Sequence, residues 1–116
     1  MRTKLRLRSN AEFQRIRREG HTLAHPLLVL SILSNNLTYS RFGFVVGRRL
    51  GKAAERNRLK RRIREAVRAR VRDGQVAAGW DVVLVARYPL REASFRQIDQ
   101  TVELLLSRAG LVSDPS

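Results

Sequence analysis

Residues 51–72 constrain the fold most, because this stretch can bury only one narrow side. Drawn at 100° per residue, its apolar side chains fall within one arc, which is the spacing of a helix with a single buried face. These side chains are Leu59, Ile63, Ala66 and Val67, with Val71 at the edge. Gly74, after Asp73, supplies a stop, since glycine adopts the left-handed conformation without steric cost. The sequence therefore predicts one amphipathic helix with a cationic outer surface.

The charge on this helix has almost one sign, because Glu55 and Glu65 are its only acidic residues. Like charges three or four residues apart each cost about 0.2–0.5 kcal/mol in an isolated helix. A polyanion relieves that repulsion by accepting the basic groups and releasing its own counterions. Most of the basic residues are arginine, which makes bidentate contacts with phosphate. The pattern favours a nucleic-acid interface over an ordinary solvated face.

Composition limits the remaining choices. The chain of 116 residues is 43% hydrophobic, which suits one folded domain, and its net charge of +14 indicates a polyanionic partner. We expect a single RNA-binding domain over residues 1–116, with 111–116 as a flexible tail. The absence of cysteine excludes a disulfide framework and thiol chemistry. No apolar run is long enough to span a bilayer, so we expect no membrane partner and a cytoplasmic location.

A small sheet and two more helices are expected around the basic helix. Capping boxes open a first helix at Ser9, ending at Gly20, and a last helix at Ser94, ending at Gly110. Strands are expected at 27–33, 39–47 and 81–87, and 21–24 is either a short edge strand or a loop. The short turn at 34–36 predicts that its two flanking strands pair antiparallel. The architecture expected is α+β, a single mixed four-stranded β-sheet with three helices and a β-α-β crossover around the basic helix.

No arrangement of side chains indicates catalysis by the protein itself. Residues 47–52 resemble a phosphate-binding loop, but the spacing is one residue short and Ala53 replaces the residue that would bind magnesium. His21 and His25 lack a third metal ligand. The few carboxylates form no cluster that would hold magnesium. We therefore assign no catalytic residue, no metal ligand and no small-molecule substrate.

The segment Arg56-Asn57-Arg58-Leu59-Lys60-Arg61 closely resembles the protein subunit of bacterial ribonuclease P. That family carries an RNR motif, followed by a basic pair, on its central helix. The similarity extends through residues 7–14, 42–49 and 79–87, and thus over nearly the whole chain except its end.

The resemblance implies a defined role. The protein would join a large catalytic RNA that removes the 5′ leader of precursor tRNA, with Mg²⁺ bound by the RNA and by substrate phosphates. The protein would be a component of an endoribonuclease without doing the chemistry. Its crossover would be left-handed, whereas the residues alone would favour the common right-handed connection. The implied contacts with the catalytic RNA are Arg48, Arg49, Lys52, Arg56, Asn57, Arg58, Lys60, Arg61 and Arg64.

The resemblance also implies a cleft for the single-stranded leader, between the first helix and the sheet. Phe13 matches an aromatic leader-contact position of the family. Arg17 and Ser31 fall where other members often carry aromatic residues. Arg17 would replace stacking by an aromatic ring with stacking of its guanidinium or with a phosphate contact.

Two alternatives remain open from the sequence. A ribosomal or other structural RNA-binding protein without a processing role would have the same composition. A helix-turn-helix DNA-binding protein would need a short helix before the basic helix, but a strand is predicted there.

Overall fold

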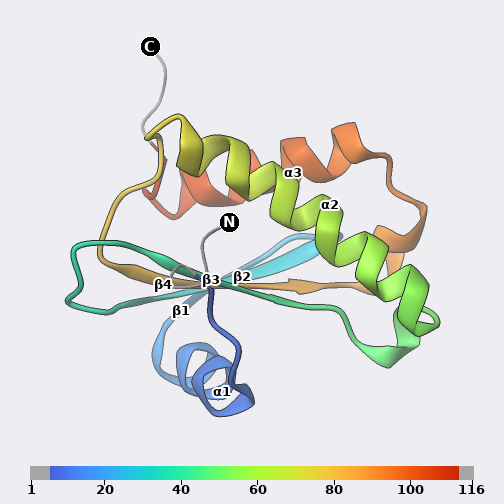
Figure 1. The fold of residues 1–116 in the computed structure, drawn as a ribbon, viewed down its shortest axis with the longest axis horizontal. Coiled ribbons are helices and arrows are strands. Elements are labelled where there is room, and N and C mark those ends of the chain that lie inside the picture. The colour runs from blue at the N-terminus through green and yellow to red at the C-terminus, as the bar shows by residue number, and fades with distance from the viewer. Residues whose placement is uncertain (1–5, 113–116) are drawn as a thin grey trace.

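One mixed sheet forms the centre of the computed structural model, which describes residues 6–112 (Figure 1). Its strands are β1 (His21–Ala24), β2 (Leu28–Ser34), β3 (Arg41–Val45) and β4 (Trp80–Ala86). Their order across the sheet is β1-β2-β4-β3. β1 pairs antiparallel with β2, β2 pairs antiparallel with β4, and β3 pairs parallel with β4. The expected mixed four-stranded sheet is confirmed, and residues 21–24 are its edge strand.

The expected pairing of β2 with β3 is wrong, because β4 lies between them. Val85 of β4 faces Val29 of β2 on one side and Val45 of β3 on the other. Val82, Val83, Leu84 and Ala86 of β4 are apolar and buried, because the central position covers both faces and both edges of the strand. The turn after β2 therefore carries the chain past the end of β4, where the Asn35 N–H donates to the Gly79 carbonyl at 2.9 Å.

Helices cover both faces of the sheet. They are α1 (Asn10–Glu19), α2 (Ala53–Arg72) and α3 (Phe95–Arg108), with 3₁₀ turns η2 (Arg48–Leu50) and η3 (Tyr88–Glu92). Figure 1 shows α2 and α3 together on one face and α1 alone on the other. The face under α2 and α3 holds the large apolar core, which includes Phe42, Phe44 and Leu84. The face under α1 has a much smaller buried cluster of Leu7, Ile16 and Val83. Alternation along β3 and β4 divides their side chains between these two faces.

The basic helix α2 matches its prediction closely. Leu59, Ile63, Ala66 and Val67 are buried against the sheet and α3. Lys52 precedes the helix and makes no side-chain capping hydrogen bond. The helix ends at Asp73 and Gly74, whose φ is +69°. The chain therefore crosses from β3 to the parallel strand β4 through α2, and the left-handed sense of that crossover stays a prediction.

The flexible tail expected from residue 111 is wrong for Leu111 and Val112. Leu111 is 2% exposed, its carbonyl accepts from the Ala77 N–H at 2.7 Å, and Val112 bridges Val76. The Leu111 N–H also donates to the Leu106 carbonyl at 2.9 Å, which satisfies a carbonyl in the last turn of α3. The same residue buries its side chain in the core. Residues 113–116 of the expected tail lie outside the described residues. No helix in the described part is long and apolar enough to cross a membrane.

Candidate RNA interface

The basic residues of α2 lie on two flanks and an outer face, because the buried stripe faces the sheet. Lys60 and Arg64 line a hollow toward the N-terminal segment. Arg58 lines a different hollow, next to η3, whose wall includes Arg91 as well as the carboxylates of Glu55 and Glu92. Helix α2 therefore presents cations in more than one direction.

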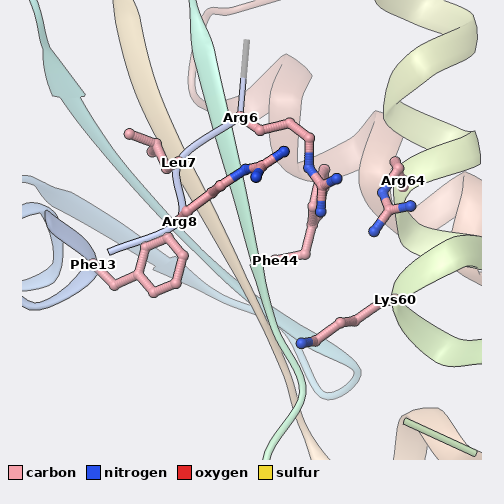
Figure 2. A pocket seen from close by; sticks show the side chains of 7 residues that line it. All are labelled: Arg6, Leu7, Arg8, Phe13, Phe44, Lys60 and Arg64. Carbon is pink, nitrogen blue, oxygen red and sulfur yellow. The ribbon is translucent and has the colours of Figure 1, made fainter. Parts of the chain in front are cut away.

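The first hollow, which we call the basic pocket, has a volume of about 300 Å³. Figure 2 shows the side chains that line it: Arg6, Leu7, Arg8, Phe13, Phe44, Lys60 and Arg64. Two arginines come from the N-terminal segment, and a lysine and an arginine come from α2. The described lining contains no carboxylate, so four positive charges share this small space without a neutralising partner. Such a site suits the oxygen atoms of phosphate groups.

The N-terminal segment is held in place by the edge of the sheet. The Leu7 N–H donates to the Phe42 carbonyl at 2.7 Å, Arg6 bridges Phe42, and the Leu7 side chain is buried. Because side chains alternate along an extended segment, Arg6 and Arg8 emerge on the side opposite Leu7. Burial, and then the positive charges of Arg64 and Arg8, lower the pKa of the Arg6 guanidinium.

Arg6 and Arg8 are not among the site residues predicted from the sequence. The alternation Arg6-Leu7-Arg8, which has the period of an extended strand, was the signal that could have found them.

The other predicted contacts lie around the start of α2. Arg48 and Arg49 are on η2, and Lys52 immediately precedes α2; all three are exposed. Asn57 and Arg61 are exposed, whereas Arg56 and Arg64 are partly covered. The Nε atoms of these two partly covered arginines are buried without a hydrogen-bond partner among the described residues. Buried donors without a partner are unfavourable, and acceptor oxygens of a bound partner would satisfy them.

The ion pairs of α2 lie toward its C-terminal end. Within residues 6–112, none of the nine predicted RNA contacts is in an ion pair. Near the C-terminal end, Arg68 pairs with Glu65 at 3.0 Å and Arg70 pairs with Asp99 at 2.8 Å. The positive charge that remains available to a polyanion is therefore concentrated in the N-terminal half of the helix.

Arg70 is buried and does not belong to the cationic outer surface that the sequence predicts for this helix. It is 8% exposed and donates to the Ala66 carbonyl at 2.8 Å, to Asp99 Oδ1 at 2.8 Å and to Glu103 Oε2 at 3.2 Å. Burial alone would lower the pKa of Arg70, but the hydrogen bonds and charges of Asp99 and Glu103 raise it above its ordinary value. Arg70 thus joins α2 to α3 instead of facing a partner.

The three predicted leader-cleft residues line two separate hollows. Arg17 and Ser31 share one of about 480 Å³ between α1 and the strands β1 and β2, with Gln14, Arg18, Thr22 and Val29. Arg17 is exposed, whereas Ser31 is 1% exposed and its hydroxyl shares a hydrogen bond of 2.9 Å with Thr22. Phe13, one turn before Arg17 on α1, lines the basic pocket instead. The two hollows therefore lie along the same helix.

A glycine fixes the position of the Phe13 ring. A Cβ atom built on Gly43 of β3 would lie 2.4 Å from Phe13 Cε1, which is closer than real atoms approach. Only a residue without a side chain lets the ring rest on the strand. Phe13 is therefore part of the junction between α1 and the sheet, with the rest of its surface in the basic pocket.

Metal-binding groups do not gather in the part of the chain that the structure describes. No group of three or more His, Cys, Asp or Glu side chains there could hold an ion. The arrangement is suited to binding phosphates with arginine and lysine.

Comparison with known proteins points to one family. The family model described as Ribonuclease P matches residues 1–110. A "Ribonuclease P protein component" of Roseiflexus castenholzii is 46% identical over 113 residues, which cover 97% of this chain and 91% of the relative. Another, of Herpetosiphon aurantiacus, is 48% identical over 109 residues, covering 94% of this chain and 87% of the relative.

Two solved structures share the fold. The Staphylococcus aureus RNase P protein aligns with a TM-score of 0.84 at 32% identity, covering 94% of this chain and 98% of that one. The RNase P protein of Thermotoga maritima aligns with a TM-score of 0.79 at 36% identity, covering 89% and 96%. The similarity thus spans nearly all of each protein.

Proposed function

Since the chain belongs to the bacterial ribonuclease P protein family, and so is the protein subunit of a tRNA-processing ribonucleoprotein, we propose that its surfaces bind two different RNAs. The N-terminal half of α2, with η2 and the basic pocket, binds the catalytic RNA. The side of the molecule at α1 binds the 5′ leader of precursor tRNA.

The unpaired positive charge on α2 supports the proposal that this helix binds the catalytic RNA. Four cations line the basic pocket, and within the described residues none of the nine predicted contacts is in an ion pair. Arginine holds phosphate oxygens through two parallel hydrogen bonds, and each neutralised phosphate releases counterions that add to the affinity. The proposed contacts are Arg48, Arg49, Lys52, Arg56, Asn57, Arg58, Lys60, Arg61 and Arg64, and we add Arg6 and Arg8 because they line the same pocket as Lys60 and Arg64.

The two hollows along α1 support the proposal that this side of the molecule binds the 5′ leader. Phe13 offers part of an aromatic ring, and Arg17 offers an exposed guanidinium one turn further on. Rings and guanidinium groups stack on any base and contact any phosphate, so leader binding is tolerant of sequence. Ser31 shapes the wall of the Arg17 hollow, since its hydroxyl is already bonded to Thr22.

The chemistry belongs to the RNA subunit in this proposal. Mg²⁺ would be bound by phosphates of the catalytic RNA and the precursor, and it would supply the activated water and charge stabilisation that phosphodiester cleavage requires. Side chains of this chain bind and position the two RNAs in the cytoplasm, and no step of the reaction passes through a protein-held metal.

Reconstitution tests the proposed function. The protein is added to the catalytic RNA at low Mg²⁺, and the rate of precursor-tRNA cleavage is measured. We expect a higher rate and tighter precursor binding than with the RNA alone. No gain in either quantity would contradict the role and favour a structural RNA-binding protein.

A charge variant tests whether binding of the catalytic RNA depends on particular side chains of α2. Replacing both Lys60 and Arg64 with glutamine should weaken binding to the catalytic RNA by about 3–6 kcal/mol, since each removes a hydrogen bond to a charged group. The matched control replaces Arg68 and Arg72 of the same helix, which removes the same net charge. A loss as large in this control would mean that only the total charge of the helix matters.

A further inference from the structure

We infer that Asp81 is a positioning residue, which fixes α1 over the sheet and thereby holds Phe13 and Arg17 where the precursor binds. The inference rests on the proposed function, because it concerns the same leader-binding side. Asp81 lies on β4 and is 0% exposed. Its side chain faces α1, as those of Val83 and Val85 do on the same strand.

The Asp81 carboxylate joins three separate parts of the chain. Arg41 of β3 donates to it twice, from Nε to Oδ1 at 2.9 Å and from Nη2 to Oδ2 at 2.7 Å. Asn35, in the turn before β3, donates to Oδ1 at 2.9 Å. From α1, the Nη2 atom of Arg15 lies 3.8 Å from Oδ2. A second carboxylate of α1, that of Glu12, lies 3.6 Å from Arg41 Nη1.

These contacts give α1 a charged attachment at two points. Glu12 and Arg15 are three residues apart and so lie on the same side of the helix. Glu12 approaches the positive member of the buried pair, and Arg15 approaches the negative member. The four charges alternate in sign, so shifting α1 along the sheet or rotating it would separate opposite charges. Phe13 lies next to Glu12, and Arg17 is two residues beyond Arg15.

Apolar packing alone holds α1 weakly. The cluster under it contains only Leu7, Ile16 and Val83 as buried members, whereas α2 and α3 share the large core on the opposite face. Apart from the seat of the Phe13 ring on Gly43, apolar burial is non-directional, so it does little to specify the register of the helix. Directional contacts to a buried carboxylate supply that register.

A purely structural role for Asp81 would have a different consequence. Unfolding of part of the population lowers binding of every RNA by the same factor, because it lowers the concentration of active protein. Displacement of α1 lowers binding of the leader only. The ratio of the affinity for precursor tRNA to that for mature tRNA, measured on the folded holoenzyme, separates the two roles.

The experiment uses holoenzyme reconstituted with the catalytic RNA, below the melting temperature of each variant. We expect Asp81→Asn to lower the precursor-to-mature affinity ratio by about fivefold or more, the scale of one lost ordinary hydrogen bond. The matched control is Asp99→Asn, which weakens the ion pair of Arg70 on the opposite face and should leave the ratio unchanged. An unchanged ratio in Asp81→Asn, or an equal fall in the control, overturns the inference.

Two further measurements keep the inference testable if Asp81→Asn folds poorly. A double variant, Glu12→Gln with Arg15→Gln, removes only the two charges of α1 that approach Arg41 and Asp81. It should also lower the precursor-to-mature affinity ratio. Combining Phe13→Ala with either change should give less than the sum of the separate effects, because both act through one contact with the leader. Full additivity would contradict the inference.

The wild-type holoenzyme distinguishes this inference from the proposed function. If the wild type itself fails to prefer precursor over mature tRNA, the proposed leader site is wrong and this inference falls with it. If the wild type prefers precursor and the network variants do too, only the role of Asp81 is overturned.

Discussion

Gly43 shows how one residue determines the geometry of the site, because the Phe13 ring occupies the place of its missing side chain. We predict that Gly43→Ala destabilises the protein by about 1–3 kcal/mol, the usual cost of overpacking. Urea denaturation followed by circular dichroism measures this. Gly47→Ala is the control, since no atom lies within 4 Å of its added Cβ. Equal stability of the two variants would mean that the ring moves aside freely.

Arg58 tests the RNR motif at the level of one side chain. It is exposed and in no ion pair among the described residues, so it contributes little to folding. Arg58→Ala should weaken binding of the catalytic RNA by about 1–3 kcal/mol, as expected for a lost charged hydrogen bond. Filter binding measures this, and a melting curve serves as the control for folding. An unfolded variant would show that the motif is structural.

Arg17 distinguishes the two proposed RNA partners. Because it lies in the hollow beside α1 and not on α2, Arg17→Ala should weaken binding of precursor tRNA more than binding of mature tRNA. The holoenzyme affinities for the two RNAs give this comparison directly. An equal effect on both would remove Arg17 from the leader cleft.

At the scale of elements, α2 is held to α3 by Arg70, as well as by apolar packing. Arg70→Ala leaves the carboxylates of Asp99 and Glu103 without their partner and removes a buried alkyl chain. We predict a loss of about 3 kcal/mol in the free energy of unfolding. RNA affinity of the folded variant should change less than in the Lys60 and Arg64 variant. The reverse order would show that Arg70 contacts RNA.

At the scale of the whole molecule, the net charge of +14 predicts binding that weakens steeply with salt. A plot of log affinity for the catalytic RNA against log salt concentration should have a slope of several units. Removing one phosphate contact, as in Lys60→Gln, should lower the slope by about one. A slope that stays the same would place Lys60 outside the contact surface.

The sequence predicts where the helices and strands of this molecule lie better than it predicts which of them pack or pair with one another. α2 is recognisable because its periodicity is local, and the RNR motif on it leads to the family that the comparisons confirm, over the ribosomal alternative. The position of β4 between β2 and β3 depends on pairing between distant segments, which no local pattern specifies. Arg70 resembles its neighbours in sequence, but its partner Asp99 lies 29 residues away. The contacts of Asp81 with Arg41 and Asn35 span 40 and 46 residues, so no local sequence pattern indicates them.

Site-specific crosslinking tests the central claim, that α2 and α1 serve different RNAs, most directly. The chain has no cysteine, so Arg61→Cys and Arg17→Cys each give a single attachment point for a photocrosslinker. Each labelled protein is assembled with the catalytic RNA and precursor tRNA, irradiated, and the crosslinked nucleotides are mapped. We predict that position 61 reacts with the catalytic RNA and position 17 with the precursor's leader. Crosslinks from both positions to the same RNA would contradict it.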